Sequence, residues 1–327
     1  MNETAPVPTI DLAATSRLAR EVLDEVNRAI VGKRDALTLV LCGVLAGGHV
    51  LLEDLPGLGK TLAARSFAQA LGLRFTRAQF TPDLLPADLT GSFVFDQRTS
   101  EFVFRQGPLF TGLLLADEIN RTPPKTQAAL LEAMEERQVS ADGITRLLPE
   151  PFVVIATQNP VEYEGTYPLP EAQLDRFLFK LLVGYPSEAQ EREVLARHHR
   201  GLDPHDVRGA GVRAVATRAH LDAARAEVSA VTVDDAVLAY VVALARATRA
   251  SGSLSLGVSP RGAAMLLHAA KAWAWLSGRG FVTPDEVKAV AKPCLRHRVI
   301  VKPELELEGA SSDTVLDGIL AAVPTPR

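Results

Sequence analysis

The chain has 327 residues, of which 47% are hydrophobic and 23% charged, typical of a soluble globular protein with room for two domains. A net charge of −4 gives no electrostatic argument for nucleic acid or an anionic membrane as the main partner. Cys42 and Cys294 form neither a disulfide framework nor a metal-binding pattern. The N-terminus lacks a signal-peptide pattern and no apolar run reaches the ~20 residues of a membrane helix, so we expect a cytoplasmic protein.

The first part of the chain alternates helices with short apolar runs. Residues 1–15 are expected to be flexible, and helical periodicity follows from Thr15 to Ile30 and from Lys33 to Leu45. The apolar run His49–Glu53 predicts a buried strand, and a helix over Lys60–Leu71 follows a short glycine-containing segment.

Further strands are predicted downstream, separated by helical segments, at Leu73–Gln79, Leu113–Asp117, Phe152–Thr157 and Phe177–Val183. Between two of them, Ser92–Phe95 and Glu101–Arg105 alternate apolar and polar residues and predict an inserted β-hairpin. Buried strands that alternate with helices indicate an α/β fold with a parallel sheet.

After Tyr185-Pro186 only helices are expected, which divides the chain into an α/β domain, residues 16–185, and an all-helical domain, residues 186–327. The predicted helices are Glu188–His199, Val233–Ala250 with Thr232 as N-cap, Arg261–Leu276 and Pro284–Arg296; residues 200–217 form a loop. We expect the basic triplet Arg296-His297-Arg298 and the acidic stretch Glu304–Glu308 at the surface.

The segment LLEDLPGLGKT, residues 51–61, ends like a Walker A phosphate-binding loop. Backbone N–H groups of Gly57, Leu58 and Gly59 would surround the phosphates, Lys60 would contact the β- and γ-phosphates, and Thr61 would bind Mg²⁺. The pattern requires glycine at position 54, where this chain has Asp54.

Two of the predicted strands have polar residues at their carboxyl ends. GLLLADEIN, residues 112–120, places Asp117 and Glu118 where a Mg²⁺ ligand and a water-orienting carboxylate belong. VVIATQNP, residues 153–160, places Asn159 where an amide can reach the γ-phosphate or the attacking water, although an Asn-Pro turn explains the same residues.

Two arginines are candidates for stabilising the transition state of phosphoryl transfer. Arg176, in PEAQLDRF (residues 170–177), fits an arginine finger that a neighbouring subunit delivers. Arg261, in VSPRGA (residues 258–263), starts a helix of the second domain and is expected to reach back to the phosphates. An ordinary surface position is the alternative for each.

Together these segments resemble the MoxR family of AAA+ ATPases, within the helix-2-insert clade. The resemblance implies an AAA+ P-loop core, a hairpin insert at 92–105 directed towards a ring pore, and a helical lid domain. An acidic residue in place of the first Walker glycine is usual in this family, so we expect Asp54 to point away from the phosphates. The implied roles are Walker B for Asp117 and Glu118, sensor 1 for Asn159, arginine finger for Arg176, sensor 2 for Arg261, an adenine pocket at Val31 and Gly32, and a subunit boundary near Arg121.

The resemblance also implies Mg²⁺-dependent hydrolysis of ATP to ADP and a homo-oligomeric ring, commonly a hexamer. It further implies chaperone-like maturation of other proteins with a von Willebrand factor A-type partner, which is membrane-bound in some systems. Three alternatives stay open: the ATPase subunit of a metal chelatase, a nucleic-acid motor, and a regulatory nucleotide binder with negligible turnover. The acidic total and the 6% aromatic content argue against the motor.

Overall fold

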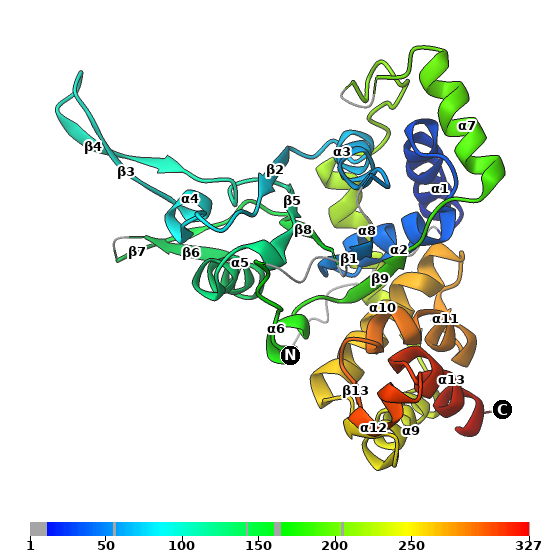
Figure 1. Cartoon of the computed structure of the whole chain (residues 1–327). Helices are drawn as coiled ribbons and strands as arrows, with labels where there is room; N and C mark the ends of the chain where they lie inside the picture. The colour runs from blue at the N-terminus through cyan, green and yellow to red at the C-terminus, as the bar shows by residue number, and fades with distance from the viewer. Residues whose placement is uncertain (1–11, 55–56, 142, 160–164, 204–205, 327) are drawn as a thin grey trace, which may run out of the picture.

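The computed structural model describes residues 12–54, 57–141, 143–159, 165–203 and 206–326, drawn in colour in Figure 1. Among these residues, no helix is long and apolar enough to cross a membrane. Residues 1–15 were expected to be flexible; of these, 1–11 lie outside the described part of the chain, whereas 12–15 form the first turn of α1 (Leu12–Ala29).

A five-stranded sheet forms the centre of the α/β half. Its strand order is β2-β5-β8-β1-β9 and all its neighbours pair in parallel. The strands are β1 (Val50–Asp54), β2 (Phe75–Gln79), β5 (Leu113–Asp117), β8 (Val153–Gln158) and β9 (Phe179–Val183). Every predicted core strand is present, and β5 has the predicted bounds.

Both faces of this sheet are covered. In β5, Leu113 and Leu115 pack into one core cluster, whereas Leu114 and Ala116 pack into another, because successive side chains point to opposite faces. The helices of this half are α1 (Leu12–Ala29), α2 (Arg34–Leu45), α3 (Lys60–Ala70), α4 (Pro86–Thr90), α5 (Pro124–Glu136), α6 (Glu171–Leu174) and the 3₁₀ turn η1 (Ile119–Arg121). The fold class is therefore the predicted α/β fold with a parallel sheet.

Two hairpins extend from this half. The predicted one, β3 (Gly91–Asp96) and β4 (Glu101–Gln106), projects far from the body (Figure 1). The second, β6 (Gln138–Ala141) and β7 (Ile144–Leu147), was not predicted. Arg146 of β7 stacks 3.8 Å from the centroid of the Phe104 ring of β4, a cation–π contact that joins the two hairpins.

The second half is helical, with α7 (Glu188–His199), α8 (Arg218–Ala230), α9 (Asp235–Ala250), α10 (Pro260–Leu276), α11 (Pro284–Leu295), α12 (Pro303–Leu307) and α13 (Ser312–Ala322). The expectation of helices alone was wrong, because it also contains short strands: β10 (Thr232–Val233) pairs with β12 (Phe281–Val282), and β11 (Leu254–Leu256) with β13 (Ile300–Val301). Thr232 therefore lies in a strand, and Asp234 caps α9 through a 2.8 Å bond from Ala236 N.

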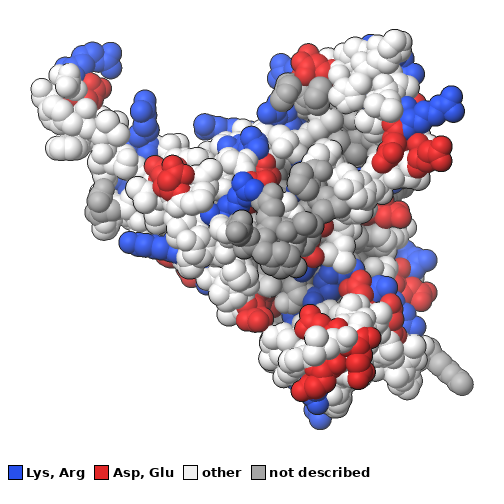
Figure 2. Space-filling model, viewed as in Figure 1, with Lys and Arg blue, Asp and Glu red and all other residues white. Residues whose placement is uncertain are grey.

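The helical half does not form one separate body. In Figure 1, α7 lies beside α1 and α8 lies behind α2, whereas α9 to α13 gather below the sheet, where α11 packs against β9. Figure 2 shows acidic side chains gathered over the lower part of this half near α12, whose first turn carries the exposed Glu304 and Glu306. The acidic stretch is exposed, as expected.

Candidate active site

The predicted phosphate loop lies between β1 and α3. Gly57 and Gly59 have φ angles of 82° and 83°, which L-amino acids rarely adopt, so the loop requires glycine at both positions. Lys60 and Thr61 are the first two residues of α3, and backbone N–H groups at a helix N-terminus point towards a bound anion. Residues 55–56 and the direction of the Asp54 side chain lie outside the described structure.

A cavity of about 580 Å³ adjoins this loop. One wall contains Val31, Gly57, Leu58 and Gly59, and the other belongs to the segment from Tyr185 to Leu202, which includes α7. The prediction of a base pocket at Val31 thus coincides with a real hollow beside the phosphate loop. The contribution of α7 was missed, because its helical pattern gave no sign of what its apolar side chains contact.

Gly32 does not line the cavity, but it fixes the approach of α7. Its φ is 70°, and a Cβ at this position would lie 2.5 Å from the Gln190 side chain. Arg197, near the other end of α7, donates to the Arg28 carbonyl at 2.6 Å, in the last turn of α1. The α7 wall of the cavity therefore packs against the end of the α1 segment at both of its ends, at Gly32 and at Arg28.

Asp117 and Glu118 lie at the carboxyl end of β5, and one buried hydroxyl holds both. The Thr157 Oγ1 donates to Asp117 Oδ1 at 2.7 Å and accepts from the Glu118 backbone N–H at 2.8 Å. Glu118 has a φ of 58°, an uncommon conformation for a residue with a side chain. Thr157, on the neighbouring strand β8, therefore fixes the start of the turn that carries Glu118.

Both carboxylates have further partners from β2. Arg77 donates to Asp117 Oδ2 through Nε at 3.0 Å and through Nη2 at 2.6 Å. The Gln79 amide donates to Glu118 Oε2 at 2.8 Å, and Arg121 Nε lies 3.3 Å from the same oxygen. Sequence reasoning missed Arg77 and Gln79, because only the pairing of β2 with β5 places them here.

The residues assigned to Mg²⁺ suit that ion. Thr61 supplies a hydroxyl and Asp117 a carboxylate, and Mg²⁺ takes one or two protein carboxylates together with phosphate oxygens and water. No group of three His, Cys, Asp or Glu side chains in the described structure could hold a metal ion by itself. The donor set therefore fits an ion that binds together with nucleotide. The buried Asn159 directly follows β8 at the same edge of the sheet.

Arg176 lies at the opposite edge of the sheet. Strands β1 and β9 are parallel, with Val50 opposite Phe179 and Asp54 opposite Val183. Arg176 precedes β9, whereas the phosphate loop follows β1, so the length of a strand separates them. Five residues at ~3.3 Å each make this about 16 Å.

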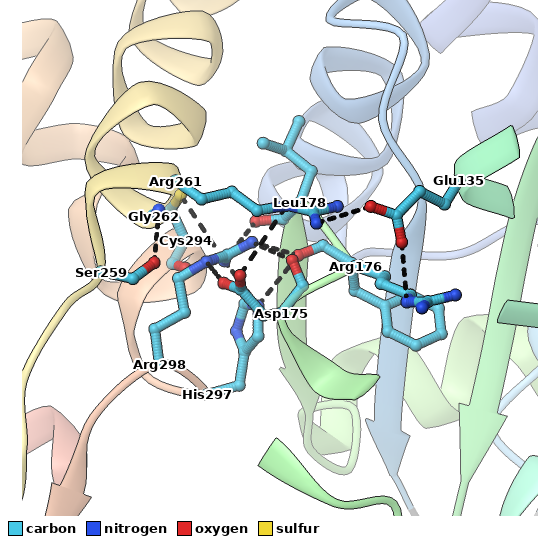
Figure 3. A network of polar contacts seen from close by, with 11 residues as sticks. Glu135, Asp175, Arg176, Leu178, Ser259, Arg261, Gly262, Cys294, His297 and Arg298 are labelled. Carbon is cyan, nitrogen blue, oxygen red and sulfur yellow. Dashed lines mark hydrogen bonds and ion pairs between the residues drawn. The ribbon is translucent and has the colours of Figure 1, made fainter. Parts of the chain in front are cut away.

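Arg261 lies beside Arg176, as Figure 3 shows. Glu135, near the end of α5, joins them: its Oε1 is 2.8 Å from Arg261 Nη1 and its Oε2 is 3.1 Å from Arg176 Nε. The expectation that Arg261 reaches back to the phosphates of its own chain is therefore not met by these contacts. Both arginines sit on a surface away from the cavity, and their sensor and finger roles stay predictions.

Comparison with known proteins agrees with this architecture. A sequence model described as "ATPase family associated with various cellular activities (AAA)" matches residues 49–179, and one described as "AAA lid domain" matches residues 246–319. The chain is 41% identical to Chaperone MoxR1 of Mycobacterium tuberculosis, over 100% of this chain and 87% of that protein. This chain belongs to the MoxR family of AAA+ ATPases.

Two further relatives match almost the whole chain, and a third matches part of it. The protein YeaC of Bacillus subtilis is 48% identical over 94% of this chain and 95% of its own length. A solved structure from Cytophaga hutchinsonii, assigned as an ATPase, superposes with a TM-score of 0.89 at 39% identity and covers 97% of each chain. The Acidiphilium rubrum magnesium-chelatase 38 kDa subunit is more distant, with 30% identity over 66% of this chain and 61% of that subunit. Within the family, this chain is an AAA+ ATPase with an α/β core and a lid.

Proposed function

We propose that this MoxR-family protein hydrolyses ATP to ADP and phosphate in a ring of identical subunits and uses the reaction to remodel or mature a partner protein. The base would occupy the cavity between Val31 and α7, and Lys60 would contact the β- and γ-phosphates. Glu118 would orient the attacking water and Asn159 would contact it or the γ-phosphate. Mg²⁺, held by Thr61 and Asp117, would neutralise charge that develops on the phosphate oxygens.

The catalytic site would be completed by a second copy. The observation that carries this proposal is the parallel register of β1 and β9, which separates Arg176 from its own phosphate loop by about 16 Å. An arginine side chain is too short to cover that distance, so Arg176 suits a nucleotide on another subunit. Repeated head-to-tail contacts of this kind close into a ring when the rotation allows it.

Arg261 would act at the same shared site, since Glu135 joins it to Arg176. The cluster of Arg176, Arg261 and Arg298 with Glu135 and Asp175 has three positive and two negative charges and so a surplus of one positive charge. That balance suits a phosphate group. A hexamer is the ring size we propose from the family resemblance.

The projecting hairpin supports contact with a partner protein. Phe102 is 69% exposed, Phe95 49%, Val103 49% and Val94 45% on β3 and β4. Exposed apolar groups of this kind commonly mark a protein-binding surface. We propose that this hairpin contacts the client, and that a von Willebrand factor A-type protein, membrane-associated or not, serves as the adaptor.

The similarity to magnesium-chelatase subunits favours a second candidate, the energy-supplying subunit of a metal-insertion complex. The two proposals share the ATPase site and differ in the client. They are separated by asking whether a folded protein or a metal-accepting macrocycle stimulates ATP hydrolysis.

Mixing two inactive variants tests the shared site. Glu118→Gln keeps Arg176 but loses the water-orienting carboxylate, whereas Arg176→Ala keeps its own site and lacks the finger. We expect each alone to lose on the order of 10³-fold in turnover. A 1:1 mixture should recover about a quarter of wild-type activity, because half of the sites and half of the fingers are intact. No recovery in mixed oligomers, verified by co-purification of two tags, would refute the proposal.

A further inference from the structure

Arg298 is buried at the junction of the two halves of the chain. The sequence predicted a basic surface triplet at Arg296-His297-Arg298, but this was wrong: His297 is 6% and Arg298 5% exposed. A guanidinium is tolerated in the interior only when its donors are satisfied, because removing it from water is costly. The hydrogen bonds of the Arg298 side chain therefore explain how its charge is tolerated in the interior.

All five N–H groups of the Arg298 guanidinium have oxygen partners (Figure 3). Nε donates to Asp175 Oδ1 at 2.7 Å. Nη2 donates to the Asp175 and Phe177 carbonyls at 3.0 and 2.6 Å. Nη1 donates to the Leu178 carbonyl at 3.3 Å and to the Cys294 carbonyl. Four of these five oxygen acceptors thus belong to residues 175–178, and Nη1 also lies 2.6 Å from His297 Nε2.

These acceptors lie on both sides of Arg176. Asp175 precedes it and Phe177 follows it, so one side chain from beyond α11 fixes the backbone on each side of the arginine. The His297 Nε2 lies 3.0 Å from the same Phe177 carbonyl. The Arg176 side chain is 29% exposed and its Nε pairs with Glu135, so the direction in which it leaves the chain depends on this backbone.

The same guanidinium stem also meets the turn that carries Arg261. A Cβ at Gly262 would lie 2.9 Å from Arg298 Cδ and 2.8 Å from Val258 Cγ1, so the absence of a side chain at this position makes room for Arg298. In addition, Asp175, which pairs with Arg298, lies 3.8 Å from Arg261 Nε. Arg298 is therefore in contact with the supports of both exposed arginines.

We propose that Arg298 is a positioning residue for Arg176, through which the helical half sets the place of the arginine that one subunit offers to its neighbour. The inference rests on the proposed function, in which Arg176 acts on another copy. It goes beyond that function by assigning a role to a buried lid residue that does not line the cavity beside the phosphate loop. If Arg298 only joined the two halves, its substitution would change stability alone. If it positions Arg176, its substitution also lowers ATP hydrolysis in the adjacent subunit.

The mixing assay isolates this effect, because the finger donor and the active site reside on different chains. The donor carries Glu118→Gln together with Arg298→Lys, which keeps the charge and the methylene stem but provides one nitrogen in place of the planar fork. Its partner is the Arg176→Ala variant. Arg298→Met provides a second donor variant, and its nucleotide affinity and thermal unfolding are measured beside those of the lysine variant.

The matched control is Glu118→Gln with Arg279→Lys. Arg279 also belongs to the helical half and pairs with a buried carboxylate, that of Glu286. None of its contacts in the described structure involves residues 175–178. This donor therefore reports what the loss of a guanidinium at another lid ion pair does to assembly and stability without disturbing Arg176.

We expect the Arg298→Lys donor to bind ATP normally and to restore roughly 100-fold less activity than the Glu118→Gln donor, the loss that a misplacement of about 1 Å can cause. The Arg279→Lys donor should restore full activity. Equal restoration by the Arg298→Lys and Arg279→Lys donors would overturn the inference and leave the shared site intact. Failure of Glu118→Gln itself to restore activity would overturn the proposed function and this inference with it.

Discussion

Replacing Thr157 with valine tests the geometry of the catalytic carboxylates most sharply. The side chain is fully buried, and its hydroxyl both donates to Asp117 Oδ1 and accepts from the Glu118 N–H. Valine has nearly the same shape, so the packing of β8 is preserved and only the two hydrogen bonds are lost. The Glu118 N–H would then lack its partner, and the turn would no longer be fixed in its uncommon φ of 58°.

The substitution should change both the stability and the turnover. Loss of the Thr157 hydroxyl leaves the Glu118 N–H without its hydrogen-bond acceptor, which costs about 2 kcal/mol of unfolding free energy. A shift of Glu118 by about 1 Å lowers turnover by roughly 100-fold. Thr157 does not line the cavity beside the phosphate loop, so the affinity for ATP should change by less than about threefold.

The assay compares steady-state phosphate release with the equilibrium binding of a fluorescent ATP analogue. The matched control is Thr157→Ser, which keeps the hydroxyl and should retain turnover within about threefold of wild type. If the valine variant hydrolysed ATP as fast as the serine variant, the assigned role of the Thr157 hydroxyl would be refuted.

Three further substitutions or conditions have expected outcomes. Gly32→Ala adds a Cβ that would lie 2.5 Å from the Gln190 side chain of α7, and it should weaken the binding of an ATP analogue about tenfold. The control is Gly47→Ala, which has the same φ of 70° but no atom within 4 Å of the added Cβ and should leave the affinity unchanged. Equal affinities of the two variants would contradict this. Gly262→Ala displaces Arg298 and should lower activity in the mixing assay while ATP binding stays unchanged; full activity would count against Arg298 as the positioning residue. Burial lowers the pKa of His49 to about 3, so below pH 6.5 only the unfolded chain gains a proton there. His49 should therefore lower the unfolding free energy, measured by urea denaturation, by about 2 kcal/mol between pH 7 and pH 5, and the buried His297, whose pKa burial also lowers, should add to this loss. An unfolding free energy that does not change between pH 7 and pH 5 would contradict this.

The elements that sequence patterns predicted best carry their signals locally. The run of five residues in β5 is apolar until its final aspartate because both faces are buried, and its bounds match the prediction. The helix α7 also has its predicted bounds, since Ser187 and Gln190 form a capping box at its start. In contrast, β10 and β12 have two residues each and join Thr232 to Phe281, a pairing that no local pattern reveals.

The same distinction holds for the site. Glycines, Lys60, Asp117 and Glu118 stand in short contiguous motifs, so their grouping at one sheet edge was predictable. Thr157 supports the carboxylates from a neighbouring strand, and strand order is a property of the fold that the local sequence does not contain. The burial of Arg298 was unpredictable for a similar reason: its acceptors are mostly carbonyl groups from a segment more than a hundred residues away.

The central claim is that a second copy completes each catalytic site. Phosphate release per subunit should be measured against protein concentration at saturating Mg-ATP, with sizing of the most dilute sample. The account predicts a specific activity that is near zero for the monomer and rises to a plateau as the copies assemble, because Arg176 cannot reach its own nucleotide. Constant activity per subunit in samples shown to be monomeric would contradict it.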